Sequence, residues 1–238
     1  MELLGLGVLG VLGGALTTVA GLGGGMMLVV VLSLLHDPRY ALAVTAPALL
    51  VSNGHRAWMF RRSLDARVAL AFAIGLVPGA LAGGVVLPAL PTWALQGLLV
   101  TMTALALARA RGLWSWKPDP RAMAPIGLGI GAVAATTGGA ALLVGPVLMS
   151  AGLRGERFVA TVALAGVSLH AGRVAGYAIS GLVGMHIAPQ IAVLLAGLLV
   201  GNVVGKRTRR SFPDGVETKV ELGALVVCTT LAVVGLAR

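Results

Sequence analysis

Long apolar runs make up most of the chain, and short polar or glycine-containing stretches separate them. A helix that crosses a lipid bilayer needs about 20 predominantly apolar residues. Six runs reach this length between charged residues, prolines or glycines. They predict transmembrane helices at 39–60, 66–87, 92–110, 155–180, 186–205 and 215–236. The pattern therefore predicts an all-α integral membrane protein.

Two further apolar regions, 3–35 and 122–151, contain an internal break. Gly21-Leu22-Gly23-Gly24-Gly25 interrupts the first, and Thr136-Thr137-Gly138-Gly139 interrupts the second. The arm left after the first break spans only about 16 Å at 1.5 Å per residue, roughly half of the hydrocarbon core. Each region is therefore predicted to form a re-entrant or broken helical hairpin, and a pair of short complete crossings remains the alternative.

The composition supports the membrane assignment. Hydrophobic residues make up 58% of the 238 residues, charged residues 11%, and the mean hydropathy is +0.96. Soluble domains are about one quarter charged, so a cytosolic enzyme or a disordered chain is excluded. The lone Cys228 excludes an intrachain disulfide. No basic segment precedes the first apolar run, so no cleavable signal peptide is expected.

The net charge of +10 is distributed in a way that indicates orientation. The basic residues form short clusters between apolar runs instead of one patch, so nucleic-acid binding is not expected. If both broken regions are hairpins, 14 of the 16 basic residues outside helix interiors lie on one face, and Arg39 and Arg238 lie on the other. If each region crosses once, the split is eight against eight. The positive-inside rule favours hairpins, with both termini outside.

Features of the first half recur in the second. Gly23-Gly24 and Gly138-Gly139 are 115 positions apart, as are His55 and His170. Glycine ridges at 75, 79 and 83 and at 197, 201 and 205 are 122 apart. The chain therefore divides into repeats at 1–115 and 116–238, each with one hairpin and three crossings. Three is odd, so the repeats have inverted topology, as in many secondary transporters. Coincidence in a glycine-rich chain is the alternative.

The hairpin tips are predicted to form an anion site. The arms 25–35 and 140–151 both begin at a glycine-rich tip, which brings two helix N-termini toward the centre of the membrane. Helix N-termini carry free N–H groups and a partial positive charge. Gly23, Gly24, Gly25, Gly138 and Gly139 would supply amides. The alternative is that these glycines only permit close packing.

Polar side chains on two predicted helices indicate the same site. Ser52, Asn53 and Arg56 lie on 39–60, and Ser168 and Arg173 lie on 155–180. An arginine within a membrane span is usually functional or reaches the interface, and the second alternative stays open for Arg56, near Arg61. His55 and His170 lie on the same two helices. They are candidates for proton coupling, with a packed, hydrogen-bonded role as the alternative.

Several kinds of chemistry are not expected. All eight carboxylates lie in loops or near helix ends, so a site for a transported cation is not expected. The four histidines lack metal-binding spacing, and no Walker motif is present. No metal, cofactor or catalytic residue is therefore predicted, and the protein is not expected to be an enzyme.

The glycine run at 21–25, its apolar arm to residue 32 and Ala43-Val44-Thr45 in the next helix resemble the sulfite exporter TauE/SafE family. The second half is similar to that family's second, degenerate copy. A proline usual after the first glycine run is replaced within Val29-Val30-Val31, and Pro146 is slightly displaced in the second copy. The resemblance implies export of sulfite or organosulfonates across the bacterial inner membrane.

The sequence thus predicts a secondary transporter that moves a small oxyanion by alternating access. The tip amides, the hydroxyls of Thr136 and Thr137, and the charges of Arg56 and Arg173 would bind it. A membrane-embedded lipid-phosphate enzyme or flippase, or a passive anion channel on the same scaffold, is the alternative. The expected partners are the small anion and the bilayer, and a homodimer stays open.

Overall fold

The computed structural model describes residues 2–21, 23–113, 119, 122–138, 141–209, 223, 226–228 and 230–231. Helices make up the regular structure of these residues, so the predicted all-α class is confirmed for them. The longer helices are α1 (Glu2–Ala20), α2 (Gly24–Leu35), α3 (Pro38–Met59), α4 (Ala66–Val86), α5 (Thr92–Ala110), α6 (Met123–Thr137), α7 (Ala141–Ser150), α8 (Gly155–Ile179) and α9 (Ala188–Arg209). Short 3-10 turns lie at Arg61–Ser63, Leu87–Ala89 and Met185–Ile187.

Four predicted spans, 39–60, 66–87, 92–110 and 155–180, correspond within one residue to α3, α4, α5 and α8. α9 continues four residues beyond the predicted 186–205. Basic side chains stabilise this last turn, because Lys206 donates to the Met59 carbonyl (3.1 Å) and Arg209 to the Val19 carbonyl (2.8 Å). The span predicted at 215–236 lies mostly outside the described residues.

Within the described residues, four segments are long and apolar enough to cross a membrane: Leu3–Ala20, Ala66–Ala89, Gly155–Ile179 and Met185–Arg209. The large hydrophobic residues on the outside of the bundle include Leu70, Ile74 and Val200, which are 60%, 71% and 54% exposed. Such surfaces suit a lipid environment, in which helices satisfy their own backbone hydrogen bonds.

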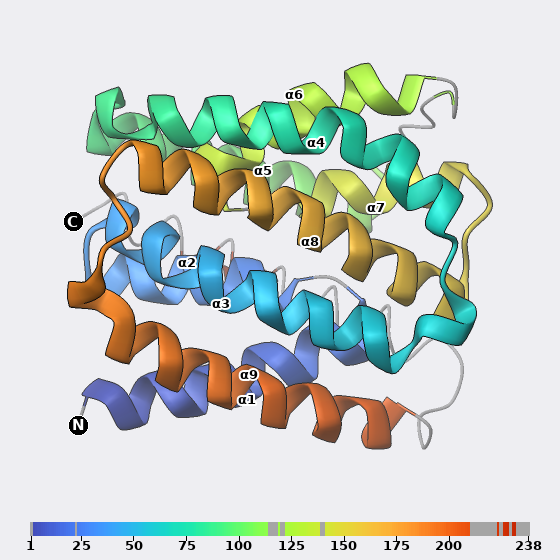
Figure 1. Cartoon of the computed structure of the whole chain (residues 1–238), viewed down its shortest axis with the longest axis horizontal. Helices are drawn as coiled ribbons and strands as arrows, with labels where there is room; N and C mark the ends of the chain where they lie inside the picture. The colour runs from blue at the N-terminus through green and yellow to red at the C-terminus, as the bar shows by residue number, and fades with distance from the viewer. Residues whose placement is uncertain are drawn as a thin grey trace.

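Both predicted breaks separate helices. α1 and α2 are joined through Gly21 and Gly23, whose φ angles are +83° and +95°, and α6 ends at Gly138, whose φ is +69°. These angles lie in the region that glycine adopts readily. In Figure 1, α1 begins and α2 ends at one end of the molecule, whereas α6 begins and α7 ends at the opposite end. The two hairpins therefore enter from opposite ends.

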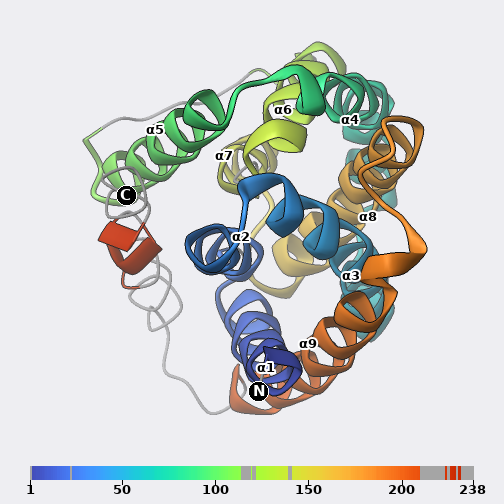
Figure 2. The same ribbon diagram turned by 90° about the vertical axis from the view of Figure 1, so that its left-hand side faces the viewer.

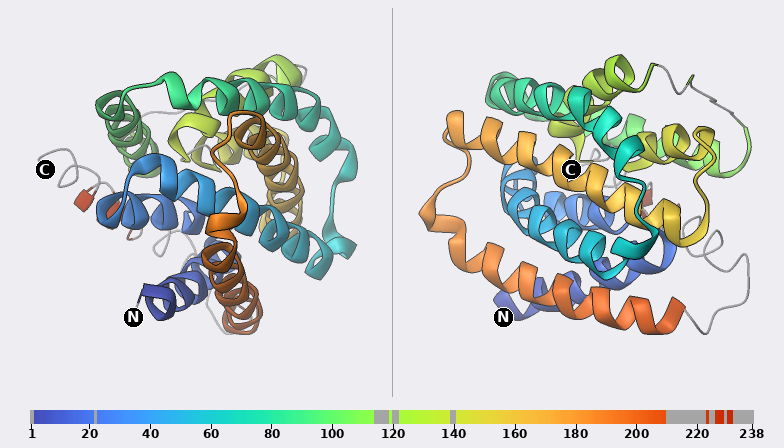
Figure 3. Two further views of the ribbon diagram at one scale, coloured as in Figure 1. Left: turned by 60° about the vertical axis from the view of Figure 1, so that its left-hand side comes forward. Right: turned by 45° about the vertical axis from the view of Figure 1, so that its right-hand side comes forward.

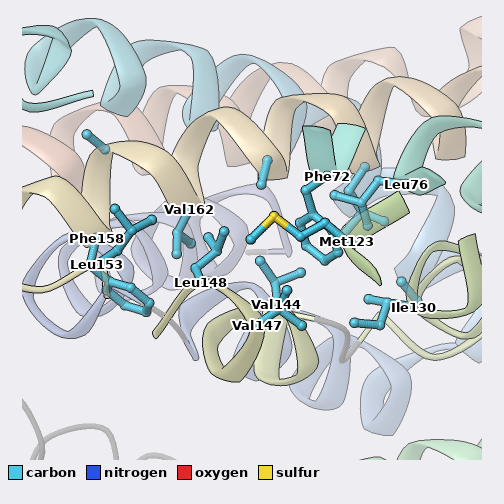
Figure 4. Packing of buried hydrophobic residues seen from close by; sticks show 14 of the residues in the cluster. Phe72, Leu76, Met123, Ile130, Val144, Val147, Leu148, Leu153, Phe158 and Val162 are labelled. Carbon is cyan, nitrogen blue, oxygen red and sulfur yellow. The ribbon is translucent and has the colours of Figure 1, made fainter. Parts of the chain in front are cut away.

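The longer helices surround the short hairpin arms. Figure 2 shows α2 and α7 inside a ring of the other helices. α1 packs along α9 on one side of the molecule and α6 packs along α4 on the opposite side, as both views of Figure 3 show. The largest apolar cluster joins α4, α6, α7 and α8, and includes Phe72, Ile130, Val147 and Phe158 (Figure 4). The arrangement brings the hairpin tips to the centre.

Candidate functional site

A cavity of about 50 Å³ lies where the two hairpin tips meet α3 and α8. A cavity needs about 10–15 Å³ to hold one water molecule, so this one has room for a few waters or one small oxyanion. Its lining residues come from both hairpins and from α3 and α8: Thr17, Gly21, Gly23, Gly25, Leu49, Ser52, Asn53, Arg56, Gly138, Val144, Val162, Gly166, Leu169 and His170.

The cavity brings together about half of the residues singled out in the sequence. Those on its wall are Gly23, Gly25, Gly138, Ser52, Asn53, Arg56 and His170. Those not on its wall are Gly24, Thr136, Thr137, Ser168, Arg173 and His55. Gly139 lies outside the described residues.

The polar groups away from the wall are engaged elsewhere. The hydroxyls of Thr136 and Thr137 each donate to the Val133 carbonyl at 2.9 Å, so they turn back onto their own helix. Ser168 donates to the Leu164 carbonyl at 3.3 Å. A Cβ on Gly24 would lie 2.0 Å from the Thr17 hydroxyl, so this glycine permits α1 and α2 to pack closely. The predicted hydroxyl donors thus do not face the cavity.

Arg56 is buried at the cavity wall, with only 1% of its surface exposed. Its Nη1 donates to the Thr17 carbonyl at 2.8 Å, and its Nη2 donates to Asn53 Oδ1 at 3.0 Å. Its Nε is buried without a hydrogen-bond partner. The side chain therefore points inward, and the alternative that it reaches the membrane interface does not describe this structure.

Arg173 is buried to the same extent on α8. Its Nη1 lies 3.3 Å from His170 Nδ1 and its Nε lies 3.1 Å from the Tyr177 hydroxyl, while its Nη2 has no partner. Because arginine can only donate, Nδ1 of His170 accepts, and a neutral His170 then carries its proton on Nε2. Arg173 is thereby connected to the cavity through His170.

The two arginines also stabilise the ends of the hairpin helices. Arg56 donates to a carbonyl in the last turn of α1, where carbonyls lack partners within the helix. In the other hairpin, the Tyr177 hydroxyl donates to the Ala135 carbonyl in the last turn of α6, and Arg173 donates to Tyr177. Each arginine therefore has a structural role at a hairpin tip, in addition to the donor that it leaves unpaired.

Acidic groups do not balance this charge within the described residues. The ion pairs formed there are Arg39–Asp37 at 3.7 Å and Arg157–Asp65 at 2.6 Å, both near the ends of helices. The same residues contain no cluster of three or more histidines, cysteines or carboxylates that could hold a metal ion. The cavity wall is thus cationic and rich in donors.

Two polar residues near the cavity were missed in the sequence. Asn202 is fully buried between α1, α3 and α9; it accepts from Thr18 at 3.0 Å and donates to the Ser52 hydroxyl at 3.0 Å. Tyr177 lies one helical turn after Arg173. The sequence could have indicated both residues. Asn202 interrupts an apolar span between two ridge glycines, and Tyr177 shares a helix face with Arg173.

The chain matches the model of the family described as Sulfite exporter TauE/SafE over residues 6–234. The match covers both hairpins and every helix that forms the cavity. No curated protein and no solved structure matches the chain.

Proposed function

Because the chain belongs to the sulfite exporter TauE/SafE family, we propose that this multi-pass membrane protein is a secondary transporter for a small oxyanion. Sulfite or an organosulfonate is the proposed substrate, and export across the bacterial inner membrane is the proposed direction. The cavity at the hairpin tips is the proposed binding site.

Two buried arginines that form no ion pair with a carboxylate of the described residues carry the proposal. A guanidinium group stays protonated, and burying a charge is costly unless it is paired. Arg56 and Arg173 are each 1% exposed and each retain one unpartnered nitrogen. A bound oxyanion would supply the missing charge to both arginines and an acceptor to Arg56, which lies on the cavity wall.

The other donors on the wall suit the same ligand. Gly23 precedes α2 without a side-chain cap, so the first amides of this helix are not satisfied by a side chain. Gly25 lies on the cavity wall, as do Ser52 and Asn53. A neutral His170 would add its Nε2–H. Together these groups would surround an oxyanion with donors, as backbone amides do at other helix N-termini.

Alternating access of two inverted repeats is the proposed mechanism. The hairpins enter from opposite ends, and α1 packs on α9 of the other half just as α6 packs on α4. In both cases the first helix of a hairpin packs on a helix of the other half. This reciprocal packing supports repeats at 1–115 and 116–238. A substrate site at the interface of such repeats can open to either side when one repeat moves against the other.

The charge distribution supports an orientation. The end of the molecule that holds the α3–α4 and α7–α8 turns carries Arg61, Arg62 and Arg154, whereas the opposite end carries Arg39. We place the first end in the cytoplasm and both termini in the periplasm. A cell interior at negative potential drives a monovalent anion outward by about 2.3 kcal/mol per 100 mV, so export needs no coupling ion.

The histidines are proposed to have different roles. His170 lies on the cavity wall, so it is the stronger candidate for proton coupling. His55 does not line the cavity; it lies 3.4 Å from Asn202 Nδ2, and Asn202 donates to Ser52 on the cavity wall. A His170→Gln variant should therefore change the pH dependence of transport more than a His55→Gln variant does.

Sulfite efflux from proteoliposomes tests the proposal. Vesicles loaded with sulfite should release it faster than protein-free vesicles, and an inside-negative potential should increase the rate. Unlabelled sulfite on the far side should accelerate exchange of labelled sulfite, which a carrier supports and a passive channel does not. The Arg67→Gln variant serves as the control, because Arg67 is exposed and does not line the cavity. Sulfite release that neither saturates nor shows exchange would contradict a carrier.

A further inference from the structure

A second cationic region lies at the ends of α3 and α9, outside the central cavity. A hollow of about 360 Å³ is lined there by His55, Trp58, Met59, Val203, Lys206 and Arg207. A neighbouring hollow of about 290 Å³ shares Met59 and Lys206 with it and is bordered by Arg61 and Arg62. The two hollows therefore form one continuous region, which the proposed transport cycle does not use.

The charge of this region fits an anionic group. Among the described residues that border it, Arg61, Arg62, Lys206 and Arg207 are permanent cations and Glu156 is the one carboxylate. In the described part of the chain none of the four forms an ion pair. Lys206 and Arg61 are held by the Met59 and Trp58 carbonyls, each at 3.1 Å, so their positions are fixed.

The walls of the larger hollow are apolar and face outward. Trp58 is 61% exposed and Val203 is 39% exposed. Val200 and Val51, which are 54% and 49% exposed, continue this apolar surface along α9 and α3. An exposed tryptophan at the end of a membrane helix is typical of the bilayer interface. A free inorganic anion gains nothing from such walls, whereas a ligand that combines an anionic group with hydrocarbon fits both parts.

The glycines near this end of α3 and α9 do not pack the two helices against each other. The ridge glycines of α9 pack against α1 instead, since a Cβ on Gly201 or Gly205 would lie 2.1 or 2.7 Å from carbonyls of α1. Gly54 on α3 has no heavy atom within 4 Å of a Cβ built on it. The space between the two helices is thus left to side chains and to whatever binds there.

We propose that the hollow between the ends of α3 and α9 binds an anionic phospholipid. Lys206, Arg207 and Arg61 contact its phosphate, and an acyl chain lies along Trp58, Val203 and Val200. Basic residues at a membrane surface attract anionic lipids with about 1 kcal/mol each, which corresponds to roughly fivefold in affinity. Since α3 also carries Ser52, Asn53 and Arg56, the bound lipid stabilises the helix that forms one wall of the central cavity.

Lipid binding by the full-length protein in detergent tests this proposal. Phosphatidylglycerol and phosphatidylcholine with identical acyl chains are titrated, with retention followed by native mass spectrometry and stabilisation by thermal denaturation. We expect phosphatidylglycerol to bind at least tenfold more tightly. The Lys206→Gln/Arg207→Gln double variant should lose most of this preference, by roughly 10- to 30-fold, whereas Arg67→Gln should keep it.

Two single variants and a competition experiment with inorganic phosphate complete the test. Arg207 is exposed, so Arg207→Gln alone should fold normally and weaken phosphatidylglycerol binding about fivefold. Trp58→Ala should weaken both lipids, because it removes the apolar wall. Equal binding of the two lipids, or an unchanged preference in Arg207→Gln, would overturn the proposal. So would displacement of the lipid by millimolar inorganic phosphate, which would assign the hollow to free anions.

Discussion

The α4–α8 crossing and the α3–α9 crossing are held together in different ways. In the first, backbones touch: a Cβ on Gly172 or Gly176 would lie 2.5 Å from the Val77 or Leu81 carbonyl of α4. In the second, the fully buried Asn202 of α9 bridges to the Ser52 carbonyl (3.2 Å) and hydroxyl (3.0 Å) of α3. The proposed repeat makes these crossings equivalent, and the hollow between the ends of α3 and α9 lies beside the second.

This difference assigns separate roles to the two crossings. Small residues on both helices permit close packing, which is the main source of helix association in a bilayer. A single polar side chain that bridges two helices holds them at a greater distance and contributes less. We therefore expect the α4–α8 crossing to be rigid and the α3–α9 crossing, next to the central cavity, to be the more adaptable.

The largest expected effect follows from enlarging a glycine at the rigid crossing. A Gly176→Ala methyl group would lie 2.5 Å from the Leu81 carbonyl and 2.9 Å from the Cα of Gly84, so the helices must separate. We expect a loss of roughly 2–3 kcal/mol in the free energy of unfolding, measured by denaturation in detergent.

Gly54→Ala is the matched control on α3. The same methyl group meets no heavy atom within 4 Å there, and alanine favours a helix over glycine by about 1 kcal/mol. Stability should be unchanged or slightly higher. If both substitutions cost the same, close backbone packing does not distinguish the two crossings.

Removing the polar bridge should have an intermediate effect. Asn202→Ala leaves the Thr18 and Ser52 hydroxyls without this buried partner, and such losses cost about 1 kcal/mol in a membrane protein. Thermal denaturation of this variant is compared with that of Thr208→Val, whose hydroxyl only donates to the Val204 carbonyl of its own helix. Equal stability of the two variants would show that Asn202 does not hold α3 to α9.

The smallest expected effect concerns the turn that ties α4 to α8. Asp65 accepts from the Val68 N–H at 3.1 Å and pairs with Arg157 at 2.6 Å, and these two contacts lower the pKa of its carboxyl. The lowered pKa means that the charged form stabilises the fold above the unfolded pKa of about 4, and that this contribution is lost as the pH falls through the folded-state pKa.

Asp65→Asn should therefore cost less than about 1 kcal/mol at pH 7, since asparagine still caps α4 and the ion pair is exposed at Arg157. The cost should vanish near pH 2. Denaturation curves at pH 7 and at low pH measure both values. A cost that persists unchanged at low pH would mean that the carboxylate charge does not contribute.

The helices and chain breaks could be predicted from the sequence because their signals are local. The lengths of the apolar runs predicted the bounds of α3, α4, α5 and α8 within one residue, and the glycine runs predicted both chain reversals. The end of α9 was placed too early, because basic residues look like a loop until their contacts with Met59 and Val19 are known.

The cavity wall could be predicted only in part. Arg56 and His170 stand out as polar groups within apolar spans, so the sequence singles them out. Whether a hydroxyl faces the cavity or its own helix depends on a rotation that no pattern encodes, and Thr136 and Thr137 turned back to Val133. Gly166 and Thr17 reach the wall only through the packing of α8 on α3 and of the first hairpin.

Sulfite binding to the purified protein tests the central claim most directly, that Arg56 on the cavity wall and Arg173, which acts through His170, create an anion site. Isothermal titration should show saturable binding, weakened roughly 10- to 100-fold in Arg56→Gln, because hydrogen bonds to charged groups contribute about 1.5–3 kcal/mol each. Arg173→Gln, which acts through His170, should weaken binding less, and the double variant should lose it. Arg56→Lys should retain part of the affinity, and Arg67→Gln all of it. A folded double variant that binds sulfite as tightly as the unmodified protein would contradict the account.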